Sequence, residues 1–282
     1  MNILRQFSIF LFLSVFFNGI QGQKLEVMTF NIRLSTASDG ENYWVKRKPD
    51  VLALLSYYQP EIFGVQEALP EQMEDLKNGL PNYHSIGVGR DDGKNKGEFS
   101  AIFYDKNLFD VLQSGTFWLS ETPEKPSKGW DAAYNRICSY ALFLTKKGKQ
   151  KFWAFNVHFD HVGQVARVRS SELILEKMKA FNPQNYPVVL TGDFNLTDET
   201  EPIKIISERL EDNFKQSQKP HYGPDGTFQA FDVLKPAEER IDYIFTKGFQ
   251  IESNRTINDR RENLLYPSDH FPVLSVLYFQ KK

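Results

Sequence analysis

The sequence lacks the features that most often reveal a protein's class at once. It has one cysteine in 282 residues, Cys138, so no disulfide can form within the chain. Small domains that depend on disulfides for stability are therefore excluded. The fold must rest on an apolar core, for which the chain offers 24 Phe, 12 Tyr and 4 Trp. Because Cys138 lies in the strand-like stretch RICSYALFL, we expect a buried, unreactive thiol.

The sequence also lacks an excess of charge of either sign. Its 34 Lys and Arg face 36 Asp and Glu, which gives a net charge of −2 at pH 7. Strong basicity is the usual mark of nucleic-acid binding, so that class is disfavoured, although a locally positive surface is compatible with this balance. We find no internal repeat and no low-complexity linker, and the length suits one large α/β domain.

The N-terminus carries an apolar run, Phe7–Phe17, which follows Arg5 and is closed by the small and polar residues Gly19–Gln23. This order is typical of a secretory signal peptide, and the run is short for a membrane span. We therefore expect cleavage after residues 1–22 and a mature domain at 23–282. The protein is expected to be secreted or periplasmic, without stable insertion into a membrane.

Hydrophobic periodicity predicts more strands than helices. Helices are expected at 48–59, 70–80, 164–181 and 201–210, with Pro49 in the first turn of the first helix, where a missing N–H costs little. Strands are expected at 24–33, 60–67, 98–105, 109–120, 187–195, 240–253 and 271–279, and as a hairpin at 137–160. This pattern predicts an α/β fold in which two sheets pack face to face with helices outside.

Polar side chains stand at the ends of these predicted strands. They are Asn31, Glu67, His158 and Asp160, Asp193 and Asn195, Asp242, and Asp269 and His270. Each alone is a weak signal, because strand ends often carry a capping Asp or Asn. In packed sheets, however, such ends can meet at one edge, where ligand sites commonly form. In VVLTGDFN the acid and the amide are two positions apart, so on an extended segment they would point to the same side.

These residue types suit hydrolysis of a phosphate ester. Glu67, Asp269 and the amide oxygen of Asn31 are hard oxygen ligands, suited to Mg²⁺, Mn²⁺ or Ca²⁺. Asp193 could orient or deprotonate a water, and Asn195 could donate to that water or to a substrate oxygen. A bound metal beside an activated water describes attack on phosphorus.

Further side chains could assist that reaction. His158 and His270 could stabilise negative charge or protonate a leaving group, and Asp242 could fix one imidazole tautomer and raise its pKa. Arg33 and Arg136 are candidate phosphate ligands through their planar donor fork, with surface salt bridges as an equal alternative. Trp118, Trp130 and Tyr134 flank the loop SETPEKPSKGWDAAYN and could stack on a base or a sugar ring, with core packing favoured for Trp118 and an equal alternative for Trp130.

From TFNIR to SDHFPV the sequence resembles the endonuclease/exonuclease/phosphatase superfamily, and the pair GDFN and SDH is the specific part of the likeness. The resemblance implies a four-layer sandwich of two packed mixed β-sheets with helices on the outer faces, similar to deoxyribonuclease I. It implies a metal site at Asn31 and Glu67, helped by Asp269. It also implies that Asp193 is the general base and that Asn195 positions the water and the phosphate. His270, paired to Asp242, would contact the scissile phosphate, and His158 would bind the phosphate or assist the leaving group.

Two departures leave the branch of that superfamily open. Arg33 stands where the AP endonucleases carry an acid, and the secreted nucleases similar to deoxyribonuclease I carry disulfides that this chain cannot form.

We therefore predict a secreted, divalent-metal-dependent phosphoesterase that uses Mg²⁺ or Mn²⁺, with a phosphodiester favoured over a phosphomonoester of a sugar or inositol. The substrate (nucleic acid, sugar phosphate or lipid head group) and the oligomeric state are not fixed by the sequence. A non-catalytic binding module is one alternative. A glycosidase using Glu67 and Asp193 is another, but it would leave the histidines and amides idle.

Overall fold

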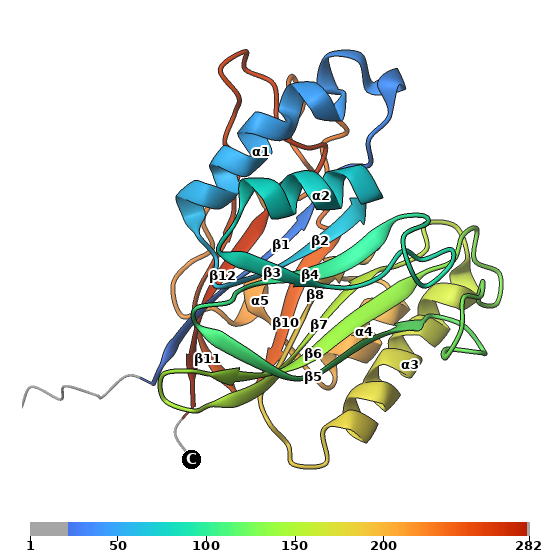
Figure 1. Cartoon of the computed structure of the whole chain (residues 1–282), viewed down its shortest axis with the longest axis vertical. Helices are drawn as coiled ribbons and strands as arrows, with labels where there is room; N and C mark the ends of the chain where they lie inside the picture. The colour runs from blue at the N-terminus through green and yellow to red at the C-terminus, as the bar shows by residue number, and fades with distance from the viewer. Residues whose placement is uncertain (1–21, 281–282) are drawn as a thin grey trace, which may run out of the picture.

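The computed structural model describes residues 22–280, and nearly all of the predicted signal peptide at 1–22 lies outside that range. Two six-stranded mixed sheets pack face to face, and helices cover their outer faces (Figure 1). The predicted four-layer α/β sandwich is thereby confirmed. Within residues 22–280 no helix combines the length and the apolar character needed to cross a membrane.

Each sheet has a parallel pair of strands at its centre. The first sheet has the order β11-β12-β1-β2-β4-β3, with β1 parallel to β2. Its strands are β1 (Lys24–Asn31), β2 (Ile62–Ala68), β3 (Tyr83–Ile86), β4 (Phe99–Asp105), β11 (Phe249–Thr256) and β12 (Val273–Phe279). The second sheet has the order β5-β6-β7-β8-β10-β9, with β7 parallel to β8. Its strands are β5 (Phe109–Trp118), β6 (Ile137–Thr145), β7 (Lys151–His158), β8 (Val188–Asp193), β9 (Glu211–Asp212) and β10 (Asp242–Lys247).

Three apolar clusters separate the four layers. Helices α1 (Trp44–Tyr58) and α2 (Pro70–Gly79) bury their apolar sides against the first sheet. Helices α3 (Gln164–Phe181) and α4 (Glu201–Ser207) do the same on the second sheet. The third cluster lies between the sheets and includes Val27, Phe152 and Leu277. Two short helical segments, η1 (Ala37–Asn42) and α5 (Asn213–Gln216), lie in connections.

The first long helix begins earlier than predicted. Helix α1 starts at Trp44, so Pro49 lies in its interior and cannot donate to the carbonyl of Val45. Trp44 is buried and its indole N–H donates to Asp75 of α2 (2.8 Å), and Arg47 is fully buried. This packing offsets the missing hydrogen bond at the proline. The short elements β3, β9 and α5 were not predicted, because two to four residues carry too little periodicity.

A buried polar network ties the two sheets together beneath one edge. Asn156 of β7 donates to the carbonyls of Val65 (2.9 Å) and Ala101 (3.0 Å) in the first sheet. Its side-chain oxygen accepts from Gln66 Nε2 at 2.7 Å. Gly64 makes room for this network, since a Cβ there would lie 2.2 Å from the Asn156 oxygen. The sheets therefore meet in a fixed register.

That register brings the predicted strand ends to one edge. β1 and β2 run parallel, as do β7 and β8, so these four strands finish on the same side. β12 is antiparallel to β1, and β10 is antiparallel to β8, so both begin there. A hydrogen bond of 2.8 Å from Asn31 to Asp193 joins the two sheets at this edge.

Candidate active site

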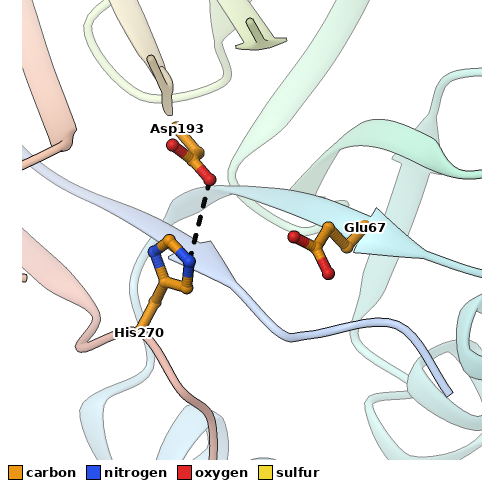
Figure 2. A group of neighbouring side chains, drawn as sticks. All are labelled: Glu67, Asp193 and His270. Atoms are coloured by element: carbon orange, nitrogen blue, oxygen red, sulfur yellow. Dashed lines mark ion pairs between the residues drawn. The ribbon is translucent and has the colours of Figure 1, made fainter. Parts of the chain in front are cut away.

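Four predicted residues from four strand ends form one buried cluster. The Asn31 amide nitrogen donates to Glu67 Oε1 (3.0 Å) and to Asp193 Oδ2 (2.8 Å). His270 Nε2 lies 3.8 Å from Asp193 Oδ2, and Figure 2 shows the imidazole turned toward that carboxylate with Glu67 nearby. Residues up to 239 positions apart in sequence thus share one site.

The backbone at the site is unusual at three positions. Arg33, Glu67 and Asn195 have φ angles of 56°, 61° and 52°, a region that side chains other than glycine rarely adopt. Such residues cost on the order of 1–3 kcal/mol each and cluster at functional sites. At Glu67 the cause is a β-bulge, since the register between β2 and β4 shifts between Val65 and Ala68. The bulge re-aims the carboxylate into the cluster.

The expected alternation of Asp193 and Asn195 on one extended strand is wrong. Strand β8 ends at Asp193, and the chain then turns through the positive φ of Asn195. The Asn195 backbone N–H donates to Asp193 Oδ1 at 2.8 Å, which fixes the carboxylate. The amide and the acid are therefore brought together by a turn.

The two histidines are held in opposite charge states. Burial alone would lower the pKa of His270, but the carboxylates of Asp242 and Asp193 outweigh it and hold that pKa well above its usual value. Its Nδ1 donates to Asp242 Oδ2 at 2.8 Å. Burial, followed by the charges of Arg136 and Arg90, lowers the pKa of His158 well below its usual value. One imidazole is thus a cation and the other is neutral, a separation typical of catalytic sites.

The contacts of His158 define its tautomer. Its Nε2 lies 3.1 Å from the Asn195 amide nitrogen, which can only donate, so Nε2 accepts. The ring proton is then on Nδ1, 3.7 Å from Glu98 Oε2. His158 Nε2 also lies 3.5 Å from Asp193 Oδ2, so this neutral ring stands directly beside the predicted base.

The carboxylates of the cluster have unequal proton affinities. Burial, and next the charge of Asp242, raises the pKa of Asp193 to about 7. Burial also raises the pKa of Asp269. Burial opposes ionisation of Glu67 as well, but the His270 cation and the hydrogen bond from Asn31 keep its pKa below the usual value.

The donor atoms of this cluster fit a hard divalent cation. Glu67 and Asp193 each present a carboxylate oxygen within 4.8 Å of the other and of a ring nitrogen of His270, which as an imidazolium has no lone pair to offer a metal. Arg33 lies 3.9 Å from Glu67 Oε2 and 3.8 Å from Asp269 Oδ2, so both predicted metal carboxylates face the same space. Three carboxylates against one imidazolium and one guanidinium leave negative charge in a buried place, which a cation would neutralise.

One predicted metal ligand does not present the expected atom. The side-chain oxygen of Asn31 accepts the Arg33 backbone N–H (2.9 Å), and its nitrogen faces the carboxylates. Coordination through that oxygen requires the amide to turn about its Cβ–Cγ bond. The metal-binding role of Asn31 therefore stays a prediction.

The predicted substrate-binding residues have different positions. Arg33 and Arg136 line the cleft above the cluster, and both are ion-paired, Arg33 to Asp39 (3.1 Å) and Arg136 to Asp160 (3.4 Å). Trp130 is not among the residues that line this cleft. A role for Trp130 in substrate binding stays a prediction.

Asp160 serves the structure of the adjacent loop. It accepts backbone N–H groups of Gly163 (2.8 Å), Ala133 (3.1 Å) and Val162 (3.1 Å). Burial would raise its pKa, but these hydrogen bonds and Arg136 bring the pKa to about 2. It holds the loop that carries the residues around position 134.

The cleft has a volume of about 550 Å³ and includes residues that the sequence did not single out as site residues. These are Arg90, Glu98, His161, Phe228 and Glu239. Glu98 directly precedes β4, which begins at the site edge, so the reasoning that singled out Asp242 at the start of β10 applies to it as well. The others lie in loops, where no sequence signal marks them.

A phosphoesterase is the class that this fold and this cluster define, since they combine buried acids, a cationic imidazole and a metal-type donor set. The model of the endonuclease/exonuclease/phosphatase family matches residues 28–270. The chain belongs to that family.

Solved relatives share nearly the whole fold. A mannosyl-6-phosphatase of Bacteroides thetaiotaomicron VPI-5482 is 42% identical and superimposes with a TM-score of 0.87 over 90% of this chain and 100% of that chain. A family protein from the same species is 41% identical with a TM-score of 0.88, over 93% of this chain and all of that chain. An uncharacterised protein of Acanthamoeba polyphaga mimivirus is 32% identical over a region that covers 60% of this chain and 64% of the viral protein.

Proposed function

We propose that the protein is a divalent-metal-dependent phosphomonoesterase that releases phosphate from a sugar phosphate. This takes the monoester alternative of the sequence analysis in preference to a phosphodiester. The observation that carries it is the pairing of the cleft arginines: Arg33 to Asp39, Arg90 to Glu98 and Arg136 to Asp160. A polynucleotide needs a row of cations that are available to successive phosphates, and paired arginines do not supply it.

Two further observations support a small sugar phosphate. A cleft of about 550 Å³ is in the range of small-molecule sites. The solved relative at 42% identity is named a mannosyl-6-phosphatase, and its whole chain aligns with this one.

The residues of the cluster divide the chemistry among them. Asp193, with a pKa of about 7, takes a proton from the attacking water near neutral pH. The Asn195 backbone holds that carboxylate in place. The imidazolium of His270, fixed by Asp242, stabilises the negative charge on the phosphoryl oxygens. The water oxygen bonds to phosphorus as the bond to the sugar oxygen breaks, and the leaving sugar oxygen takes up a proton from solvent, which yields phosphate and free sugar.

Glu67 and Asp269, with Asn31, would hold Mg²⁺ or Mn²⁺. When bound, such an ion supplies positive charge to the phosphoryl oxygens. Neutral His158 positions Asn195 and Asp193 through the contacts described above.

The test compares a hexose 6-phosphate, p-nitrophenyl phosphate and bis-p-nitrophenyl phosphate with Mg²⁺, with Mn²⁺ and with EDTA. We expect monoester hydrolysis that EDTA abolishes and that Asp193→Ala lacks. Asp110→Ala, on an exposed position of β5, is the matched control and should keep full activity. Activity that persists in EDTA would overturn the metal dependence, and a preference for the diester would overturn the monoester assignment.

We also propose that the protein acts outside the cytoplasm. The apolar run at Phe7–Phe17 supports export. Expression of the full chain in a bacterium, followed by fractionation and N-terminal sequencing, should recover a protein beginning near Gln23 in the periplasm or medium. An intact N-terminus in the cytoplasm would contradict export.

A further inference from the structure

We propose that Tyr134 and His161 form a platform on which the sugar ring of the substrate packs, and that buried arginines hold this platform rigid. The inference rests on the proposed function and adds the residues that select the leaving group. Both side chains line the cleft above the catalytic cluster. Their rings stack at a centroid separation of 5.9 Å with 18° between the planes.

Tyr134 is exposed in a way that packing does not explain. More than half of it, 53%, is accessible to solvent, although it lines a cleft that leads to buried catalytic groups. Aromatic rings carry a large apolar surface, so an open ring beside a reacting centre is a site for the flat face of a ligand. The C–H face of a pyranose ring is such a surface.

Two buried arginines lie over the Tyr134 ring. The guanidinium carbon of Arg90 lies 5.0 Å from the centroid of the Tyr134 ring, and that of Arg136 lies 6.0 Å from it. Each arginine is buried and is itself held by a carboxylate, Arg90 by Glu98 (2.7 Å) and Arg136 by Asp160 (3.4 Å). A ring supported in this way loses little entropy when a ligand packs on it.

The platform is electrically balanced. His161 Nδ1 lies 3.2 Å from Arg136 Nη2, and a guanidinium can only donate, so Nδ1 is the acceptor in this contact. The two arginines are matched by two carboxylates. An uncharged, hydroxyl-bearing ring suits this surface better than a second phosphate.

A chain of contacts links the platform to the reacting groups. Glu98, which pairs with Arg90, lies 3.7 Å from one nitrogen of His158. The other ring nitrogen lies 3.5 Å from Asp193. One guanidinium, one carboxylate and one imidazole therefore connect the Tyr134 ring to Asp193, and all of these groups line the same cleft.

The deciding measurement is the ratio of kcat/KM for mannose 6-phosphate to that for glycerol 2-phosphate, a monoester without a ring. We expect Tyr134→Leu to lower this ratio about tenfold, mainly through KM for the sugar phosphate, because stacking binds the ring in ground state and transition state alike. Tyr134→Phe keeps the aromatic face and should retain most of the ratio.

Tyr222→Leu is the matched control. Tyr222 is also an exposed tyrosine (69%) with an arginine over its ring, Arg255 at 5.4 Å, but it does not line the cleft. The substitution Tyr222→Leu should leave the ratio of kcat/KM values at that of the wild type. Thermal unfolding of all three variants confirms that each is folded.

Each outcome separates this inference from the proposed function. If the wild type hydrolyses neither monoester, the proposed function fails. If the wild type hydrolyses both monoesters and Tyr134→Leu leaves the ratio unchanged, the platform is overturned while the function stands. If Tyr134→Leu affects a nucleoside 5′-monophosphate more than the sugar phosphate, the platform binds a base and the sugar assignment is wrong.

Discussion

Asp193 and Asp242 are direct partners across the antiparallel strands β8 and β10. Two buried acids therefore stand side by side, and His270 contacts both, at 2.8 Å from Asp242 and 3.8 Å from Asp193. In this arrangement Asp242 anchors the His270 imidazolium, and burial together with the charge of Asp242 raises the pKa of Asp193 to about 7. A β-ladder thus tunes a candidate base to neutral pH.

Replacing Asp193 should remove activity and change how stability depends on pH. We expect Asp193→Asn to lose about three orders of magnitude in kcat. The folded pKa is raised above its unfolded value of 3.8, so ionisation of Asp193 costs stability increasingly as the pH rises from about 4 to 7. In metal-free protein, the change in the free energy of unfolding caused by Asp193→Asn should therefore be more favourable at pH 8 than at pH 4, by on the order of 2 kcal/mol.

Urea denaturation at pH 4 and at pH 8, in EDTA, measures this difference. Asp110→Asn, on an exposed position, is the control for losing one charge. An effect of equal size at the two pH values would show that ionisation of Asp193 carries no such cost.

Replacing Asp242 should shift the alkaline limb of the pH–rate profile. Asp242 raises the pKa of His270, which keeps the imidazolium protonated above pH 6.5. Asp242→Asn removes that charge, so His270 should lose its proton at lower pH, and kcat/KM should fall at lower pH than in wild type. The shift is expected to exceed one pH unit, or about 1.4 kcal/mol.

The profile is measured from pH 5 to pH 10, and proton NMR of His270 gives its titration directly. Asp225→Asn, an exposed acid outside the cleft, should leave the profile in place. If Asp242→Asn leaves the alkaline limb unshifted, the deprotonation that causes this limb belongs to a group other than His270.

Replacing Glu67 should abolish tight binding of the metal. Calorimetry of wild type with Mg²⁺ or Mn²⁺ should show a bound ion, and Glu67→Gln should weaken it at least about tenfold. Addition of Mg²⁺ should raise the melting temperature of wild type and not of the variant. Glu71→Gln, exposed at the start of α2, is the control. Unchanged affinity in Glu67→Gln would move the metal site elsewhere.

Arg47 should prove essential to stability although it pairs with no carboxylate. Its guanidinium donates to the carbonyls of Ile32, Arg33 (2.6 Å) and Pro267 (3.1 Å), in the loop that follows Asn31 and in the loop that carries Asp269. Burial lowers its pKa to about 10.

Arg47→Met would leave those buried carbonyls without donors. We expect a loss of about 2–4 kcal/mol in the free energy of unfolding, measured by urea denaturation. The exposed neighbour Lys46→Met should change it by less than about 0.5 kcal/mol. A similarly small change in Arg47→Met would show that water replaces the guanidinium.

Much of the fold and the candidate site could be predicted because both depend on short-range pattern. Helix α3 has the predicted bounds, Gln164–Phe181, and its buried residues Ala166, Ser170, Ile174 and Met178 recur every four positions. The strand-end rule found Asn31 and Asp193, on which buried strands stop, and Asp242, on which a buried strand starts, because such polar residues are visible locally. It missed Glu98, at the start of an antiparallel strand, and Arg90 and His161, in loops whose course no local pattern fixes.

The sequence by itself determined which chemistry the chain can carry, namely acids, amides and histidines at the ends of apolar strands and no second cysteine. Only the tertiary structure decided the charge state of each group. His158 and His270 are the same residue type at strand ends, yet one is neutral and one is a cation. The reason is that a pKa depends on burial and on charges within a few ångströms, and the neighbours that set it come from strands far apart in the chain.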